Sequence, residues 1–260
     1  MFKTCYTINI FYISCLLLDV IIIGVFMEYL IIISISIFCL IILAIIYDVK
    51  INTIKKIKEL SFSKELDEIT NKLPKNIVVC EEILKQIGNF GKVKVIQDEN
   101  KNAKASLYIV ATNTISIANI NGTCTRIQTI AHECVHSIQN KKLLMFNFIF
   151  SNIYILYFLV ICILTFFNKI QNPLIQIYIL TLLSFIYYKV RSFLETDAMT
   201  KAPFVAEKYM ENSKILNENE ITKIMDSYKI INNLGIKIAN LELFAKCIFK
   251  IIIYAFLCFI

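Results

Sequence analysis

Apolar residues in this chain are gathered into four long blocks, and charged residues lie almost entirely between those blocks. A membrane-spanning helix needs about 20 mostly apolar residues in succession. The pattern therefore predicts a protein that crosses a lipid bilayer several times, with polar segments between the crossings. The four apolar blocks are residues 7–47, 143–167, 174–190 and 243–260.

The first block is long enough for two spans. We expect a helical hairpin made of residues 7–26 and 29–47, with a turn near Gly24 and Glu28. Asp19 then falls inside the first span. A carboxylate at that depth either serves a function, or lies near the bilayer surface or pairs with a neighbouring helix, and both readings stay open.

The second and third blocks predict another hairpin, joined by the short loop 168–173. A hairpin returns the chain to the side that it left, so the polar segments before and after it share one side of the membrane. The last block, 243–260, is short, and we interpret it as one more transmembrane helix.

Composition agrees with a membrane protein. Hydrophobic residues make up 57% of the 260 residues, whereas soluble domains contain about half or less. The chain has 27 Lys and Arg against 20 Asp and Glu. These lysines flank apolar blocks, with a cluster between Lys50 and Lys64, so the positive-inside rule places that flank in the cytoplasm. We therefore expect the lipid bilayer of the cell membrane as a partner, and no nucleic acid. The nine cysteines include no CxxC pair, which is typical of a reducing compartment.

The polar segments carry periodic patterns of their own. We expect helices over most of them and one or two strands just before residue 120, where Tyr, Val, Thr and Ile are frequent. Two roles stay open for these strands: an exposed edge could hold a peptide as an added strand, or the sheet could simply cover the helix that follows. The expected helices are 48–72, 74–88 and two within 203–245, and the expected strands are 92–96 and 105–120.

One stretch carries recognisable metal chemistry. The chain has two histidines, and both belong to the pattern HExxH formed by His132, Glu133 and His136. On a helix, positions i and i+4 share a face, so both imidazoles can reach one ion. Catalytic zinc takes three protein ligands and keeps one position for water, and Glu133 is placed to accept the proton of that water.

A third protein ligand must come from elsewhere. With no further histidine, it must be a carboxylate or a cysteine, and we choose Glu195, which lies on a predicted helix just after the second hairpin. Asp197 lies on another face of that helix and is a candidate for supporting a ligand. Arg191 and Tyr108 are candidates for stabilising the charge that develops on a substrate oxygen. Cys134, between the two histidines, points away from the metal face, and we interpret it as a packing residue.

These motifs resemble a known family from about residue 75 onward. The sequence His-Glu-Cys-Val-His-Ser-Ile-Gln139, the hairpin after it, and Leu194-Glu195-Thr-Asp197-Ala198 are similar to the YugP-like neutral zinc metallopeptidases of bacterial membranes, which share their plan with the HtpX-type membrane gluzincins. The resemblance implies one zinc ion per chain, held by His132, His136 and Glu195, with Glu133 as base. Two positions depart from the family pattern: Met199 replaces a frequent Asp, and Val135 replaces a frequent Gly.

The fold we expect is mainly α, a multi-pass helical bundle with a small α+β zincin-like core at the cytoplasmic face. Its predicted function is zinc-dependent hydrolysis of peptide bonds in a peptide or membrane-protein substrate, and the resemblance suggests membrane-protein quality control. The alternatives are an intramembrane zinc protease and a degenerate peptidase that binds partners without cutting. The expected parts are a transmembrane hairpin (1–47), the segment with the motif (48–142), a second hairpin (143–190), cytoplasmic helices with the third ligand (191–242) and a last transmembrane helix (243–260).

Overall fold

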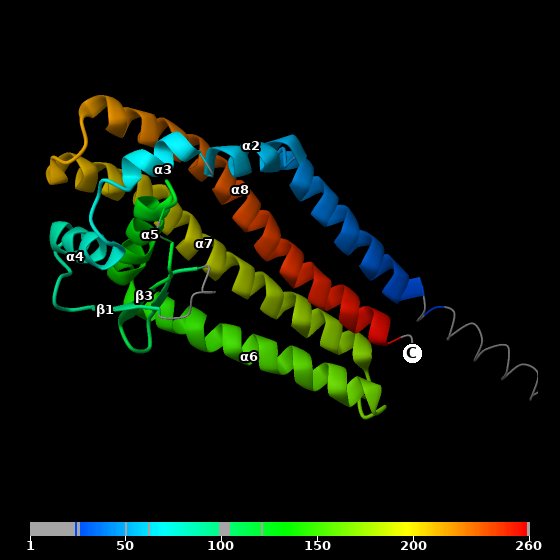
Figure 1. The fold of residues 1–260 in the computed structure, drawn as a ribbon. Coiled ribbons are helices and arrows are strands. Elements are labelled where there is room, and N and C mark those ends of the chain that lie inside the picture. Colours follow the sequence, from blue (N-terminus) through cyan, green and yellow to red (C-terminus); the bar gives the residue numbers. More distant parts are fainter. Residues whose placement is uncertain are drawn as a thin grey trace, which may run out of the picture.

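The protein is mainly helical, with one small sheet (Figure 1). The structure, a computed structural model, describes Gly24 and residues 27–49, 51–61, 63–98, 105–120 and 122–258. The predicted first span, apart from Gly24, and its Asp19 lie outside these residues. The elements that carry labels are α2 (Ile51–Ser61), α3 (Lys64–Thr70), α4 (Asn76–Gln86), β1 (Lys94–Gln97), β2 (Leu107–Ile109), β3 (Thr114–Ile117), α5 (Arg126–Ile138), α6 (Lys141–Phe166), α7 (Pro173–Ser213) and α8 (Glu218–Leu257).

Three helices of the described chain are long and apolar enough to cross a membrane: Met27–Ile46, α6 and α7. They run side by side with the second half of α8 (Figure 1). The side chains between them form an apolar core that includes Tyr154, Leu180 and Tyr254. Large apolar side chains also point outward, such as Leu156, which is 62% exposed. Apolar residues on both the inner and the outer face are what a helix surrounded by lipid requires.

The predicted second hairpin is confirmed as a pair of helices. The 26 residues of α6 reach about 39 Å at 1.5 Å per residue, which exceeds the roughly 30 Å hydrocarbon thickness of a bilayer. Asn172 begins α7 by accepting a hydrogen bond from the N–H of Ile175, with Pro173 at the first helical position. Gly24 and Glu28, near which a turn was expected, are both helical, and residues 25–26 between them lie outside the described part of the chain.

Two helix boundaries predicted after the second hairpin, near residues 190 and 243, are wrong. The chain stays helical from Pro173 to Ser213, through the change from apolar to polar residues near Arg191 and through Pro203. The helix stops where Lys214 takes a left-handed φ of 54°. The second long helix, α8, likewise continues into the last apolar block. It begins after Asn217, which forms a capping box with Glu220. A helix can therefore continue from an apolar stretch of sequence into a polar one without ending.

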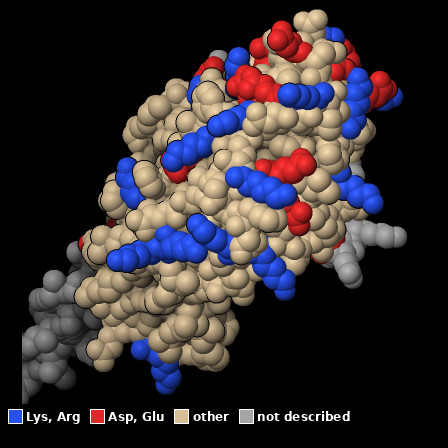
Figure 2. Space-filling model, turned by 90° about the vertical axis from the view of Figure 1, so that its left-hand side faces the viewer, with Lys and Arg blue, Asp and Glu red and all other residues tan. Residues whose placement is uncertain are grey.

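The shorter elements form a second core at one end of the molecule. The sheet has the order β1-β3-β2, with β1 parallel and β2 antiparallel to β3, so β2 is an edge strand. Ile115 and Ile117 of β3 pack with α4, α5 and the adjoining parts of α7 and α8 in a core of their own. Figure 2 looks onto this end, where basic and acidic side chains are both spread over the surface.

Candidate metal centre

The motif helix α5 brings its two histidines together. Its apolar residues Ile127, Ile130 and Cys134 are fully buried in the adjacent core, which leaves the opposite face for His132 and His136. Their Nε2 atoms lie 3.0 Å apart. Cys134 packs with its sulfur 3.6 Å from that of Cys80, as expected for a packing residue.

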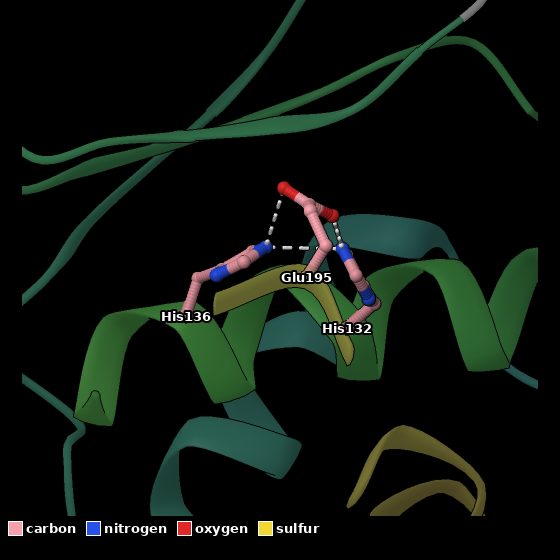
Figure 3. Close-up of side chains that lie close together, drawn as sticks. All are labelled: His132, His136 and Glu195. Carbon is pink, nitrogen blue, oxygen red and sulfur yellow. Dashed lines mark hydrogen bonds and ion pairs between the residues drawn. The ribbon is translucent and has the colours of Figure 1, made fainter. Parts of the chain in front are cut away.

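Glu195 comes to the same point from α7 (Figure 3). Its Oε2 lies 3.3 Å from Nε2 of His132, and its Oε1 lies 3.6 Å from Nε2 of His136. The three side chains form a cluster that could hold a metal ion. Zn–N and Zn–O bonds of about 2.0–2.2 Å in a tetrahedral shell separate neighbouring ligand atoms by about 3.3–3.5 Å. The observed spacing therefore fits one small tetrahedral ion.

Glu133 lies beside this cluster and is itself buried, with 7% of its surface exposed. Burial raises the pKa of its carboxyl group above the ordinary value, while His132, His136 and the backbone N–H of Tyr108 oppose the rise. A carboxylate with a raised pKa accepts a proton more readily near neutral pH. The raised pKa is compatible with the predicted role of Glu133 as a base.

A second layer of contacts holds His136, and its central residue was not among the predicted site residues. Nδ1 of His136 lies 2.8 Å from Oε1 of Gln139, and Nε2 of Gln139 donates to Oδ2 of Asp197 at 2.8 Å. An N–H on Nδ1 leaves Nε2 free for a metal. Burial lowers the pKa of His136, but Glu195, Glu133 and Gln139 together raise it, so the pKa ends above its ordinary value. Asp197 thus reaches the site through Gln139, and Lys201 pairs with its other oxygen at 2.6 Å.

The two residues proposed for oxyanion stabilisation both line the pocket in front of the cluster, which has a volume of about 340 Å³. Arg191 places Nη2 2.7 Å from Oε1 of Glu195. The hydroxyl group of Tyr108 donates to Oδ1 of Asn113 at 2.7 Å, and burial raises its pKa. The side chain of Arg191 therefore contacts the predicted ligand, whereas Tyr108 turns its hydroxyl toward Asn113.

Scans of the chain against family models, curated proteins and solved structures find no match. The case for a function therefore rests on the site itself. Its residues bring two imidazoles, a carboxylate and a buried acid to the wall of one pocket.

Proposed function

We propose that this protein is a membrane-embedded zinc metallopeptidase of the YugP-like kind, with its site at the cytoplasmic end of the bundle. The convergence of His132, His136 and Glu195 beside Glu133 carries the proposal. Zinc is the metal of choice because it favours a tetrahedral shell of imidazole nitrogens and a carboxylate oxygen, with one position open for water.

Each residue then has a role in hydrolysis. Zinc, when bound, polarises the scissile carbonyl group and acidifies water. Glu133 accepts the proton of the attacking water and passes it to the leaving amine. Gln139 and Asp197 hold His136 in the orientation that directs Nε2 to the metal. Arg191, at the pocket wall beside Glu195, supplies a positive charge near the reacting carbonyl.

The position of α5 favours this proposal over an intramembrane protease. An enzyme of that class carries its motif within a membrane span, whereas α5 has 13 residues and is not among the three described helices that could cross a bilayer. The lysine cluster between Lys50 and Lys64 supports a cytoplasmic location for this end of the molecule, because positive residues are more frequent on the inner side of membranes.

The proposal is tested on the full chain purified in detergent. Elemental analysis should find about one zinc per chain, and His136→Ala and Glu195→Gln should each abolish stoichiometric binding. Glu133→Gln should keep zinc but lose cleavage of β-casein by about 10²–10⁴-fold. Glu207→Gln, an acidic residue further along α7, is the matched control and should behave as wild type. Zinc at full occupancy with no cleavage of any protein probe would instead favour a partner-binding protein.

A further inference from the structure

The pocket in front of His132, His136 and Glu195 has two unlike walls. One is the edge of the sheet, with Leu107 and Tyr108 of β2. The other is the beginning of the membrane helix α6, which supplies Leu144, Asn147, Phe148 and Ser151. These four positions are spaced i, i+3, i+4 and i+7, so they form a single face of the helix. The pocket therefore lies between a sheet edge and a membrane span.

Asn147 is the unexplained residue of the α6 wall. It is buried, with 7% of its surface exposed, and its Oδ1 has no hydrogen-bond partner in the described part of the chain. One turn further along α6, Ser151 and Asn152 both donate to the carbonyl oxygen of Phe148. A buried polar atom without a partner is unfavourable by the desolvation cost of that atom. A ligand that brings an N–H donor to the pocket would give Oδ1 of Asn147 a partner and remove this cost.

The β2 wall indicates what kind of ligand supplies that donor. Tyr108 lies in the edge strand, and its backbone N–H turns toward Glu133. An extended peptide laid along such an edge pairs one of its two sides with the strand. Its other side then faces α6, whose backbone N–H and C=O groups are already paired within the helix. The peptide groups on that side depend on side chains, and Asn147 offers an acceptor there.

We propose that Oδ1 of Asn147 accepts a hydrogen bond from one backbone N–H of an extended polypeptide substrate, on the side of that peptide away from β2. The inference rests on the proposed peptidase function. It makes α6 a part of the substrate site, with the bound peptide lying along the first turns of a membrane helix. Asn147 is six residues past Lys141, or about 9 Å along the helix, so the substrate is bound close to the membrane border.

The test combines substitution of Asn147 with removal of single N–H donors from the substrate backbone, and it compares the effects of the two changes alone and together. The probe is a quenched fluorescent peptide of about ten residues, copied from a β-casein segment that the wild-type protein cleaves. Each amide is N-methylated in turn, which removes one N–H donor at a time. Wild type should lose about tenfold in kcat/KM at one particular amide beyond the loss at its neighbours. In Asn147→Leu the unmethylated peptide should itself be cleaved about tenfold less efficiently, and the extra loss at that amide should disappear.

Asn152→Leu is the matched control, because it is the same substitution on the same helix at an exposed position that does not line the pocket. It should keep the wild-type methylation profile. Zinc content and thermal stability of Asn147→Leu should match wild type, and Asn147→Ala repeats the test should the leucine variant fail to fold. An Asn147 variant that retains the wild-type methylation profile overturns this inference while cleavage itself still supports the peptidase. A wild-type protein that cleaves no peptide overturns both.

Discussion

Gln139 joins the helix that supplies two of the three metal-cluster residues to the helix that supplies the third. Its amide oxygen meets Nδ1 of His136, and its amide nitrogen donates both to Asp197 and to the backbone oxygen of Leu194, next to Glu195. One side chain therefore holds the orientation of the His136 ring and the position of α7 relative to α5. Contacts of this kind usually matter for metal affinity nearly as much as the ligands do.

We predict that Gln139→Leu weakens zinc binding by about 10–100-fold without unfolding the protein. The substitution keeps the side-chain volume but removes all three hydrogen bonds. Competition with a chelator of known zinc affinity measures the effect. Gln128→Leu is the control, since Gln128 lies on the same helix and its amide contacts Asn232 of α8. Equal zinc affinity in the two variants would contradict the role given to Gln139.

The contrast between Glu195 and Gln139 shows how far residue chemistry could be predicted. The spacing of His132, Glu133 and His136 along the sequence is a local pattern, and it predicted their place at the candidate site. Glu195 followed from the need for a third ligand, because the chain has no other histidine. Gln139 carries no such signal: a glutamine after a helix is common, and its role arises only when α7 packs against α5. Asp197 was expected to support a ligand, but the route through Gln139 depends on the same packing.

At the scale of elements, Arg126 at the start of α5 organises the turn between α3 and α4. It is 3% exposed and donates to the backbone oxygens of Thr70, Leu73 and Pro74. It also donates to the side chain of Asn76, the first residue of α4. A guanidinium group has five N–H donors in a fixed fork, so one residue can pair several helix-end carbonyl groups at once.

Arg126→Met should lower the free energy of unfolding by about 3 kcal/mol or more, because it leaves several buried carbonyl oxygens without a hydrogen-bond donor. Chemical denaturation in detergent, followed by circular dichroism, provides the measurement. The control is Lys72→Met, which removes the exposed ion pair with Glu220 and should cost about 1 kcal/mol or less. A loss for Arg126→Met no larger than that of the control would show that the turn holds without it.

Helices α7 and α8 approach closely where Gly235 faces Met199. A Cβ added at Gly235 would lie 3.1 Å from Cε of Met199, which is the mobile end of a flexible side chain. Met199 occupies the position where the resembling family often has Asp, one turn after Glu195. In this chain the position serves packing between two long helices, which the departure from the family pattern alone did not reveal.

Gly235→Ala should leave the melting temperature unchanged or raise it, because Met199 can shift and alanine favours a helix by about 1 kcal/mol over glycine. Gly235→Leu should destabilise the protein by about 1–3 kcal/mol, since the larger side chain must separate α7 from α8. Thermal unfolding in detergent distinguishes the two. Equal destabilisation by both substitutions would mean that the backbone of Gly235, and not the space beside Met199, sets the requirement.

At the scale of the whole molecule, α7 and α8 extend from the apolar bundle into the polar core without interruption. The sequence predicted three apolar helices long enough to cross a membrane, namely Met27–Ile46, α6 and α7, and it predicted the motif helix, because each depends on a local pattern. It did not predict the continuity, since helices were ended where polarity changed. The physical consequence is that Glu195 sits on the rigid extension of a membrane helix. Its position beside His132 and His136 is therefore coupled to the packing of the bundle.

The same architecture makes a prediction about topology. Atoms of His136 and Glu195 lie 3.6 Å apart, although α6 and most of the apolar part of α7 intervene between these residues in the sequence. If α6 crosses a bilayer, such closeness requires that α7 crosses back, because a bilayer core is about 30 Å thick. Residues before α6 and after the apolar part of α7 must then share one side, and the loop between the two helices must lie on the other.

Single cysteines at Lys142, Lys208 and Gln171, all exposed positions, test this in a variant whose nine native cysteines are replaced. A membrane-impermeant maleimide applied to intact cells should label position 171 and spare positions 142 and 208, because the positive-inside rule and the lysine cluster near Lys50 predict a cytoplasmic site. Labelling of 142 and 208 with protection of 171 would keep the ligands together but reverse the orientation. Positions 142 and 208 on opposite sides would remove Glu195 from the site, since no metal–oxygen bond spans a bilayer.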